Sequence, residues 1–251
     1  MAATLYAVPA SHPCAAVERA LQLKRVAYRR VDLPPVAHKA FQQALFGGGT
    51  VPGVTLDGRR ILGSRPIVRA LDARAPEPRL LPEDRKARQP IELAEGWGDE
   101  VLQPLVRRVL WSALRRAPAA MPSYSEGSSL RIPAPAARVA APLVARAEQR
   151  INAASDASVR ADLANLGHHL ARVERWMEHD VIGGEQPNAA DLQIGAGLRL
   201  LLTLEDVAGS VGSRGALDLA RRWFPDYPGR VPAGVLPAAW LPSRLNVNGG
   251  G

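Results

Sequence analysis

Cysteine is almost absent from this sequence, because Cys14 is the only one among 251 residues. No disulfide can form within the chain, which excludes a small secreted fold held together by disulfides. Long apolar runs are missing as well: none approaches the roughly 20 residues that a membrane-spanning helix needs. The first ten residues lack the basic start and the apolar stretch of a signal peptide. We therefore expect a cytoplasmic protein with no membrane partner.

Lysine is also scarce. It supplies only three of the 32 basic residues, and the formal net charge is +8. Such a charge attracts nucleic acid, acidic membranes and small anions alike. The pairs Arg107-Arg108 and Arg115-Arg116 have no interleaved aromatic residues, so we interpret them as a solvated face. We expect no nucleic acid among the partners; a basic nucleic-acid adaptor is an alternative that rests on charge alone.

Signatures of metal and phosphate binding are missing too. His168 and His169 are adjacent, and no further ligand lies one helical turn away on the same face, which argues against a zinc site. The glycine run 47–49 follows no strand and precedes no Gly-Lys-Ser/Thr, so it is not a phosphate-binding loop. The sequence therefore predicts no metal.

What the chain does have is 47% hydrophobic residues, enough to build a large core. Short apolar runs predict strands over 4–8 and 27–33, and Asp57-Gly58 between two apolar runs predicts a hairpin. Helices are expected from Pro13, over 37–46, and from Ser64 as the N-cap residue. This alternation predicts a small α/β domain. Its expected bounds are residues 1–76, with a linker over 77–86.

Strand signals vanish after the linker, which predicts an all-helical second domain over residues 87–245. Apolar residues at helical spacing predict one helix over 91–114, kinked at Pro104, and an amphipathic helix over 159–177. The other expectations are an exposed loop over 117–135, a helix over 137–152 started or interrupted near Pro142, a buried segment over 198–204, a helix over 216–224, a surface tail over 225–242 and disorder over 246–251.

Three short motifs occur in order along the first domain. Ser11-x-x-Cys14 lies at a strand-to-helix turn, Val51-Pro52 follows the glycine run, and the third is Gly63-Ser64-Arg65-Pro66-Ile67-Val68. Together they resemble the thioredoxin-like domain of the glutathione S-transferase superfamily. That family places its catalytic Ser, Cys or Tyr at the first motif, a cis-proline at the second and its grip on the γ-glutamyl group at the third. The resemblance implies an α/β thioredoxin-like N-terminal domain followed by an all-α glutathione-transferase-type C-terminal domain.

A fourth motif lies in the helical part. Asn188 can cap a helix while Asp191 reaches back to its free N–H groups. In the family a similar Ser/Thr-x-x-Asp begins a core helix, and asparagine keeps the acceptor. The Gly-Gly-x-x-Pro-Asn-x-Ala-Asp-Leu form and the long connection before it resemble the prostaglandin E synthase 2 branch. That branch has a Cys-Pro-x-Cys motif where this sequence has Ser11-His12-Pro13-Cys14, so this resemblance concerns architecture and not substrate.

The family resemblance implies a detoxifying transferase that binds glutathione and adds its thiolate to an electrophilic small molecule. Ser11 and Cys14 are the candidate catalytic residues. An unperturbed thiol has a pKa near 8.5, so little of it is ionised at neutral pH. One charge-assisted hydrogen bond from Ser11 contributes roughly 1.5–3 kcal/mol, which lowers the thiol pKa by about one to two units. Ser11 would thus act as a donor to sulfur and not as a nucleophile.

The other site residues are also implied by the resemblance. The backbone of Val51, positioned by cis-Pro52, would pair with the cysteinyl part of the tripeptide. Ser64 would take the γ-glutamyl carboxylate at a helix N-terminus, and Lys39 and Arg65 would bind the carboxylates. The full set of candidate thiol-binding residues is His12, Lys39, Val51, Pro52, Ser64 and Arg65.

Each of these assignments has a structural alternative. Ser11 and Ser64 can cap helices whether or not a ligand binds, and Cys14, which has no partner for dithiol exchange, suits a small buried position. Gly63 stands where the family has an acidic or amide residue, which leaves another low-molecular-weight thiol open in place of glutathione. The alternative function is a non-catalytic binding or regulatory member, and a homodimer is also open. Aromatic residues that either line a second-substrate pocket or pack in the core are Trp97, Trp111 and Tyr124.

Overall fold

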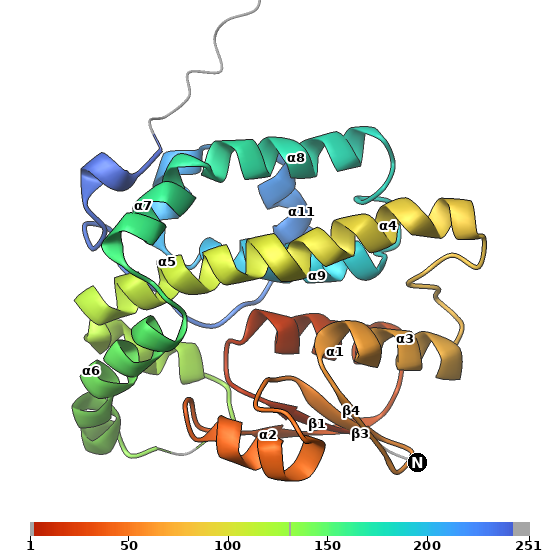
Figure 1. Cartoon of the computed structure of the whole chain (residues 1–251), viewed down its shortest axis with the longest axis horizontal. Helices are drawn as coiled ribbons and strands as arrows, with labels where there is room; N and C mark the ends of the chain where they lie inside the picture. Colours follow the sequence, from red (N-terminus) through yellow and green to blue (C-terminus); the bar gives the residue numbers. More distant parts are fainter. Residues whose placement is uncertain (1–2, 131, 243–251) are drawn as a thin grey trace, which may run out of the picture.

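The computed structural model describes residues 3–130 and 132–242, which form a four-stranded sheet with its helices, followed by a helical region (Figure 1). The strand order is β2-β1-β3-β4, with β1 parallel to β2 and antiparallel to β3. Figure 1 shows α1 and α3 between this sheet and the long helices α4 and α5. The predicted fold class is confirmed. The elements of the first part are β1 (Ala3–Ala7), α1 (His12–Leu23), β2 (Tyr28–Asp32), α2 (His38–Phe46), β3 (Gly53–Leu56), β4 (Arg59–Leu62) and α3 (Ser64–Arg74).

The predicted hairpin joins β3 to β4. Leu56 pairs with Arg59, and the two residues between them, Asp57 and Gly58, have φ angles of 47° and 81°. Positive φ at both central positions matches the right-handed twist of the flanking strands, and Asp-Gly is a favoured pair for it. This part of the sequence prediction is confirmed at the level of single residues.

In the second part, the described residues form helices joined by loops, and the β-structure among them is one isolated bridge between Leu204 and Val231. None of its helices, nor any other helix in the described part of the chain, is long and apolar enough to cross a membrane. The elements are α4 (Arg85–Trp97), the π-helical turn η1 (Gly98–Leu102), α5 (Gln103–Arg116), the 3-10 helix η2 (Pro118–Ser125), α6 (Ala134–Ile151), α7 (Asp156–Ala164), α8 (Leu166–Glu178), α9 (Ala189–Leu201), α10 (Glu205–Val211), α11 (Gly215–Trp223) and the 3-10 helix η3 (Ala238–Trp240).

Several predicted helices differ in detail from the observed ones. The expected kink at Pro104 takes the form of the π-helical turn η1, because a proline has no N–H for the carbonyl of the preceding turn and its ring crowds that turn. The single helix expected over 159–177 is divided at Asn165, whose side-chain amide donates to the Ala161 carbonyl at 2.9 Å and competes with the backbone.

The predicted loop over 117–135 is also partly wrong. Residues 118–125 form η2, and Tyr124 at its end is buried, where its hydroxyl shares a 2.7 Å hydrogen bond with the Thr203 hydroxyl. Helix α6 begins earlier than expected and continues through Pro142 without interruption. Pro142 is exposed, so water can satisfy the carbonyl that loses its partner.

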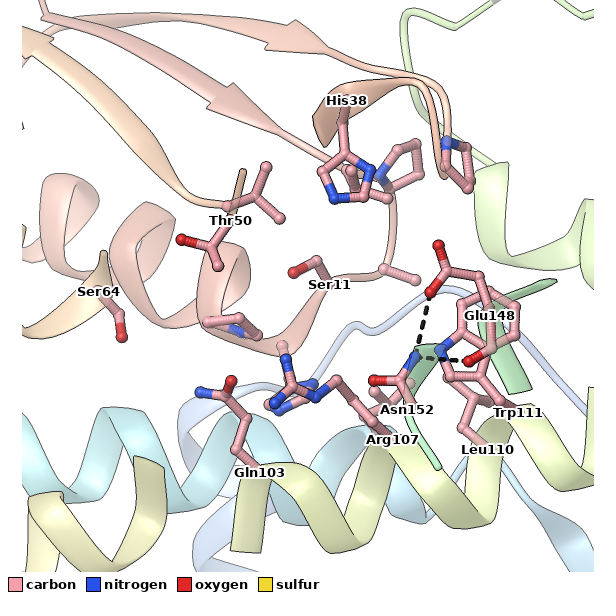
Figure 2. Close-up of a pocket in the computed structure, with 18 of the residues that line it drawn as sticks. Ser11, His38, Thr50, Ser64, Gln103, Arg107, Leu110, Trp111, Glu148 and Asn152 are labelled. Carbon is pink, nitrogen blue, oxygen red and sulfur yellow. Dashed lines mark hydrogen bonds between the residues drawn. The ribbon is translucent and has the colours of Figure 1, made fainter. Parts of the chain in front are cut away.

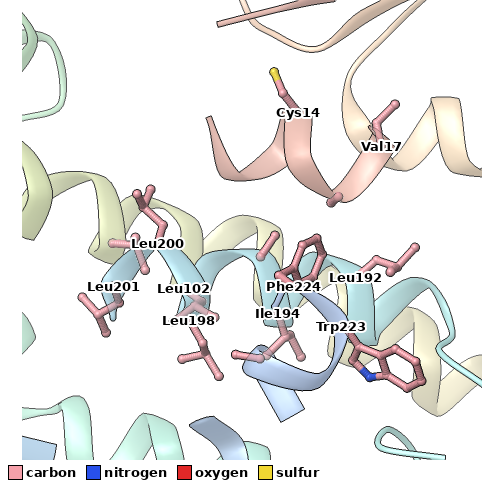
Figure 3. Close-up of a cluster of buried hydrophobic side chains, with 14 of the residues drawn as sticks. Cys14, Val17, Leu102, Leu192, Ile194, Leu198, Leu200, Leu201, Trp223 and Phe224 are labelled. Atoms are coloured by element: carbon pink, nitrogen blue, oxygen red, sulfur yellow. The ribbon is translucent and has the colours of Figure 1, made fainter. Parts of the chain in front are cut away.

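Helix α9 lies at the centre of the molecule. Twelve of its 13 residues are buried, and it packs against α11, α1 and α4. Figure 3 shows α1 lying over α9, with Cys14 and Val17 on the first helix and Leu192 and Phe224 among the side chains of the cluster below. The first part of the chain is therefore joined to the second through a shared apolar core.

The N-terminus of α9 is closed by its own side chains. Asn188 Oδ1 accepts from the backbone N–H groups of Ala190 and Asp191, and the Asp191 carboxylate accepts from the N–H groups of Asn188 and Gly183 at 2.9 and 2.8 Å. The predicted capping box is confirmed. The apolar segment over 198–204 is mostly buried as expected, whereas the expectation for 246–251 lies outside the described residues.

Candidate functional site

A cavity of about 960 Å³ lies between the sheet part and the helical part. Figure 2 shows Ser11 near its middle, Thr50 and His38 on one wall and Arg107 reaching in from α5 on the opposite wall. Cys14 and Pro52 are not among the residues that line it. The predicted site residues that do line the cavity are Ser11, His12, Lys39, Val51, Ser64 and Arg65.

Ser11 stands at the N-terminus of α1 in an extended conformation. Within the described part of the chain its hydroxyl makes no capping hydrogen bond to the helix, and Pro13 in the first turn has no N–H to offer. The preceding residue, Ala10, has a positive φ of 55°, and its carbonyl accepts a 2.8 Å hydrogen bond from the Tyr227 hydroxyl of the C-terminal tail. The tail thus holds the turn that presents Ser11 and the free end of α1 to the cavity.

Cys14 points into the core and not into the cavity. Its residue is 1% exposed, and burial raises the pKa of the thiol to about 11. A protonated, enclosed thiol is a poor nucleophile, because the thiolate is the reactive form. The geometry fits the interpretation of Cys14 as a small buried residue and gives no support to a catalytic role.

The Val51-Pro52 peptide bond is cis, as the resemblance implied. The Pro52 carbonyl accepts from the Gly63 N–H at 2.9 Å and so joins this turn to the start of α3. Gly63 has a φ of 92°, a conformation that L side chains rarely adopt. The glycine that departs from the family pattern is therefore explained by the backbone here.

Ser64 is the first residue of α3, and not its N-cap as the sequence predicted. Gly63 occupies the N-cap position, and the Ser64 side chain makes no capping hydrogen bond in the described structure. Next to it, Arg65 donates to the buried carboxylate of Glu95 at 3.3 Å, and Arg69 donates to the same carboxylate at 2.6 Å. Arg65 therefore lines the cavity while already paired with an acid from α4.

The helical wall of the cavity contains polar residues that the sequence prediction missed. Gln103, Arg107 and Trp111 follow one another at intervals of four along α5, with Leu110 and Leu114 beside them. The spacing of Gln103 and Arg107 among apolar residues at helical intervals is the sequence pattern that could have indicated this polar wall. The interpretation of Arg107 as part of a solvated face is wrong, because its side chain lines the cavity. The other missed residues on this side are Asp99, Glu148 and Asn152.

The neighbouring arginines have other partners. Arg108 forms a two-pronged ion pair with Asp162 at 2.6 and 2.7 Å, and Arg116 pairs with Asp156 and lies over the Trp240 ring. Only Arg107 of the two basic pairs lines the cavity.

His12 is the most perturbed group of the site. Its side chain is enclosed at 2% exposure, and its Nε2 has no hydrogen-bond partner in the described structure. Burial, together with the positive charge of Arg107, lowers the pKa of this imidazole to about 3. His12 is therefore neutral at physiological pH, and a neutral imidazole can donate or accept one hydrogen bond at that atom.

The three aromatic residues considered for a second-substrate pocket lie in two different places. Trp111 and Tyr124 line the cavity, whereas Trp97 packs in the helical core with its ring 5.2 Å from that of Trp176. Tyr124 has a structural role as well, because its ring fills the space beside Gly229, where any side chain would collide. No group of metal-ligating side chains occurs in the described residues.

Residues 5–79 match the family model described as the glutathione S-transferase N-terminal domain. No curated protein matches the sequence significantly. The structure is similar to a glutathione S-transferase from Rhodospirillum rubrum, with 22% identity, a TM-score of 0.59 and coverage of 88% of this chain and 85% of that chain. It is also similar to FzlA from C. crescentus, with 19% identity, a TM-score of 0.59 and coverage of 95% and 97%.

A third similar structure is a theta-class glutathione S-transferase from the citrus canker pathogen Xanthomonas axonopodis, which was solved with glutathione bound. The identity is 18%, the TM-score 0.59 and the coverage 89% of this chain and 91% of that chain. At these identities the likeness concerns the fold. Residues 5–79 therefore match a glutathione S-transferase N-terminal domain, and the described chain has the overall fold of these solved structures.

Proposed function

We propose that this protein binds glutathione or a related low-molecular-weight thiol, ionises it, and transfers the thiolate to an electrophilic small molecule. The observation that carries the proposal is one cavity that brings the open N-terminus of α1, with Ser11, against the wall formed by α5 and α6. A thiol held at that helix end and an electrophile held on the helical wall would share the same space.

Ser11 and the first N–H groups of α1 would stabilise the thiolate. The first N–H groups of a helix have no carbonyl partner within it, and the helix dipole adds positive potential at the same point. The reaction ionises the S–H bond, forms a bond from sulfur to the electrophilic carbon and releases the leaving group with its electron pair. No residue of the protein becomes covalently attached.

The rest of the thiol would lie along the sheet part of the cavity. The Val51 backbone beside cis-Pro52 offers strand-like pairing, and Ser64 lies at the N-terminus of α3, where a carboxylate is favoured. Lys39 lines the same wall. The positive charge of Arg65 is partly neutralised by its ion pair with Glu95. We therefore expect Lys39 to contribute more than Arg65 to binding a carboxylate.

The test is a titration of the protein with glutathione, in which thiolate absorbance and conjugation of chlorodinitrobenzene are followed across pH. In the Ser11→Ala variant we expect the pKa of the bound thiol to rise by about one to two units, because one charge-assisted hydrogen bond is lost. Ser155→Ala is the matched control: Ser155 also stands at a helix N-terminus, that of α7, but does not line the cavity.

Three results would overturn parts of this proposal. Absence of binding at millimolar glutathione removes glutathione as the ligand. An unchanged thiol pKa in Ser11→Ala removes Ser11 from its role. Binding without ionisation or conjugation supports the alternative, a non-catalytic member that uses the fold for binding or regulation.

A further inference from the structure

Arg107 is a cation that faces the cavity without an ion pair. Its Nε–H is buried and has no hydrogen-bond partner in the described residues, and no carboxylate there lies within ion-pair distance of its guanidinium. A buried donor without an acceptor is costly, on the order of 1–3 kcal/mol, and such groups are usually satisfied by a ligand or water. Figure 2 shows this side chain extending from α5 into the cavity between Gln103 and Trp111.

Two carboxylates flank Arg107 at longer range, and each has its own donors. Asp99 Oδ1 accepts from the amides of Gln103 and Gln193 at 2.9 and 3.4 Å. Glu148 Oε2 accepts from the Asn152 amide at 3.1 Å. Burial lowers the pKa of Arg107, while Asp99 and Glu148 act in the opposite direction. The two acids therefore help to hold Arg107 in its charged form but leave its guanidinium edge free.

His12 supplies a second unpartnered atom close to the same place. Its side chain is 2% exposed, it lines the cavity, and its Nε2 has no hydrogen-bond partner in the described structure. Because this imidazole is neutral, it adds no competing charge and can donate to an oxygen that approaches Arg107. A planar pair of oxygens on one carbon matches the fork of a guanidinium.

The surface beyond Arg107 is apolar and aromatic. Trp111 and Leu110 follow it on α5, and Met121 lines the cavity from η2. Trp111 is only partly buried and lines the cavity, so its ring is placed to contact a flat ligand. The wall thus combines one cation with an aromatic platform one turn away.

We infer that the helical half of the cavity selects an aromatic electrophile that carries a carboxylate, with Arg107 binding the carboxylate, His12 donating to one of its oxygens and Trp111 stacking on the ring. This assignment rests on the proposed function for the thiol, but the binding of the acid itself does not need the thiol. In a chloronitrobenzoate, for example, sulfur bonds to the ring carbon as chloride leaves, and the carboxylate is unchanged.

The binding test uses three unreactive ligands of similar size and different charge: para-nitrobenzoate, its near-isosteric amide para-nitrobenzamide, and para-nitrobenzylammonium. Calorimetric titration of the full chain without any thiol is expected to rank the benzoate first. The preference of benzoate over benzamide should be about tenfold or more, as for one charge-assisted contact. Equal affinity for the three, or tighter binding of the ammonium compound, would overturn the inference.

The variants assign the preference to one residue. Arg107→Gln is expected to lower the ratio of benzoate affinity to benzamide affinity about tenfold or more. Arg107→Lys should keep part of this ratio, because lysine retains the positive charge but cannot form two parallel hydrogen bonds to a carboxylate. Arg115→Gln is the matched control, since Arg115 lies two turns further along α5 and is exposed. If Arg107→Gln does not fold, Arg107→Lys carries the test. A ratio that stays at the wild-type value in the Arg107 variants, or falls equally in Arg115→Gln, contradicts the inference.

The reaction provides an independent measurement. With the thiol bound, kcat/KM for a chlorodinitrobenzoate should exceed that for the matching amide, and the excess should fall in Arg107→Gln. If glutathione fails to bind while nitrobenzoate still binds through Arg107, the proposed reaction is wrong and the acid site remains. If glutathione binds and conjugates only neutral electrophiles, the reaction stands and the acid site is wrong.

Discussion

Helices α9 and α1 both start at a residue type that commonly caps helices, Asn188 and Ser11, but their N-termini end in opposite states. At α9, Asn188 and Asp191 satisfy the free N–H groups, and the helix end is sealed inside the protein. At α1, Ser11 makes no cap bond, Pro13 removes one donor, and the end opens onto the cavity. His12, in the first turn, keeps an unpartnered nitrogen.

This difference separates a helix end that stabilises the fold from one that is available to a ligand. Every helix begins with N–H groups that have no partner within it. When nearby side chains supply acceptors, those groups contribute to stability. When none does, the same groups and the helix dipole remain to bind an anion. The stability and the ligand chemistry of this protein should therefore respond to mutation at different helix ends.

The largest expected effect lies at the sealed end. Asp191→Ala removes the acceptor of two partly buried N–H groups, those of Asn188 and Gly183, and we expect it to lower the free energy of unfolding by about 3 kcal/mol. Because burial raises the pKa of Asp191 to about 6, denaturant unfolding should be measured well above that pH. Asn188→Ser is the control, since serine keeps an acceptor for the helix. A loss below about 1 kcal/mol in Asp191→Ala would mean that this cap does not stabilise the fold.

The second effect concerns acid and the open end. The pKa of His12 is about 3 in the folded protein and 6.5 in the unfolded chain. Between these two pH values the unfolded chain binds a proton at His12 and the folded protein does not. Stability from this group is complete above pH 6.5 and is lost as pH falls toward 3, at about 1.4 kcal/mol per pH unit. Between pH 6.5 and about pH 5 the loss is therefore about 2 kcal/mol.

The measurement is urea unfolding of the wild type and of His12→Gln across this pH range. The variant should lose less stability than the wild type on acidification, by about the amount given for His12. His168→Gln, which changes an exposed histidine away from the cavity, is the control variant. Parallel curves for wild type and His12→Gln would show that His12 is not held neutral by the fold.

The smallest effects compare two serines at helix N-termini. The Ser155 hydroxyl accepts from the Ser158 N–H at 3.1 Å, so Ser155→Ala should lower the free energy of unfolding by about 1 kcal/mol. Ser11→Ala breaks no capping bond and should change it by less than about 0.5 kcal/mol. Thermal unfolding of the two variants side by side checks the order. A larger loss in Ser11→Ala would place Ser11 among the structural caps.

Several expectations drawn from the sequence stay predictions. These are the bounds of the two domains, the cytoplasmic location, the absence of nucleic-acid partners, the homodimer and the likeness to the prostaglandin E synthase 2 branch. The resemblance to glutathione transferases is of a different kind, because the family match and the fold both support it.

How far the sequence could predict the site depends on the range of the interactions involved. The row Gln103, Arg107, Trp111 is visible in the sequence, but α5 packs against α6, α7 and α9, and only their arrangement decides which of its polar residues faces the cavity. The partner of Arg65, Glu95, lies 30 residues away on another helix, and no local pattern connects the two. Gly63 departs from the family pattern in the sequence, and only its positive φ in the folded chain explains why glycine stands there.

By itself, the sequence determined those features whose interactions lie within a few residues: the Asp57-Gly58 hairpin, the Asn188–Asp191 capping box and the first turn of α1 with Pro13 in it. Their hydrogen bonds and backbone preferences are local, so the residue types suffice. The tertiary structure decided that Cys14 faces the core, that Arg107 faces the cavity and that His12 is enclosed beside it. These outcomes follow from how distant helices share one apolar core, because burial and charge at a point depend on every element packed around it.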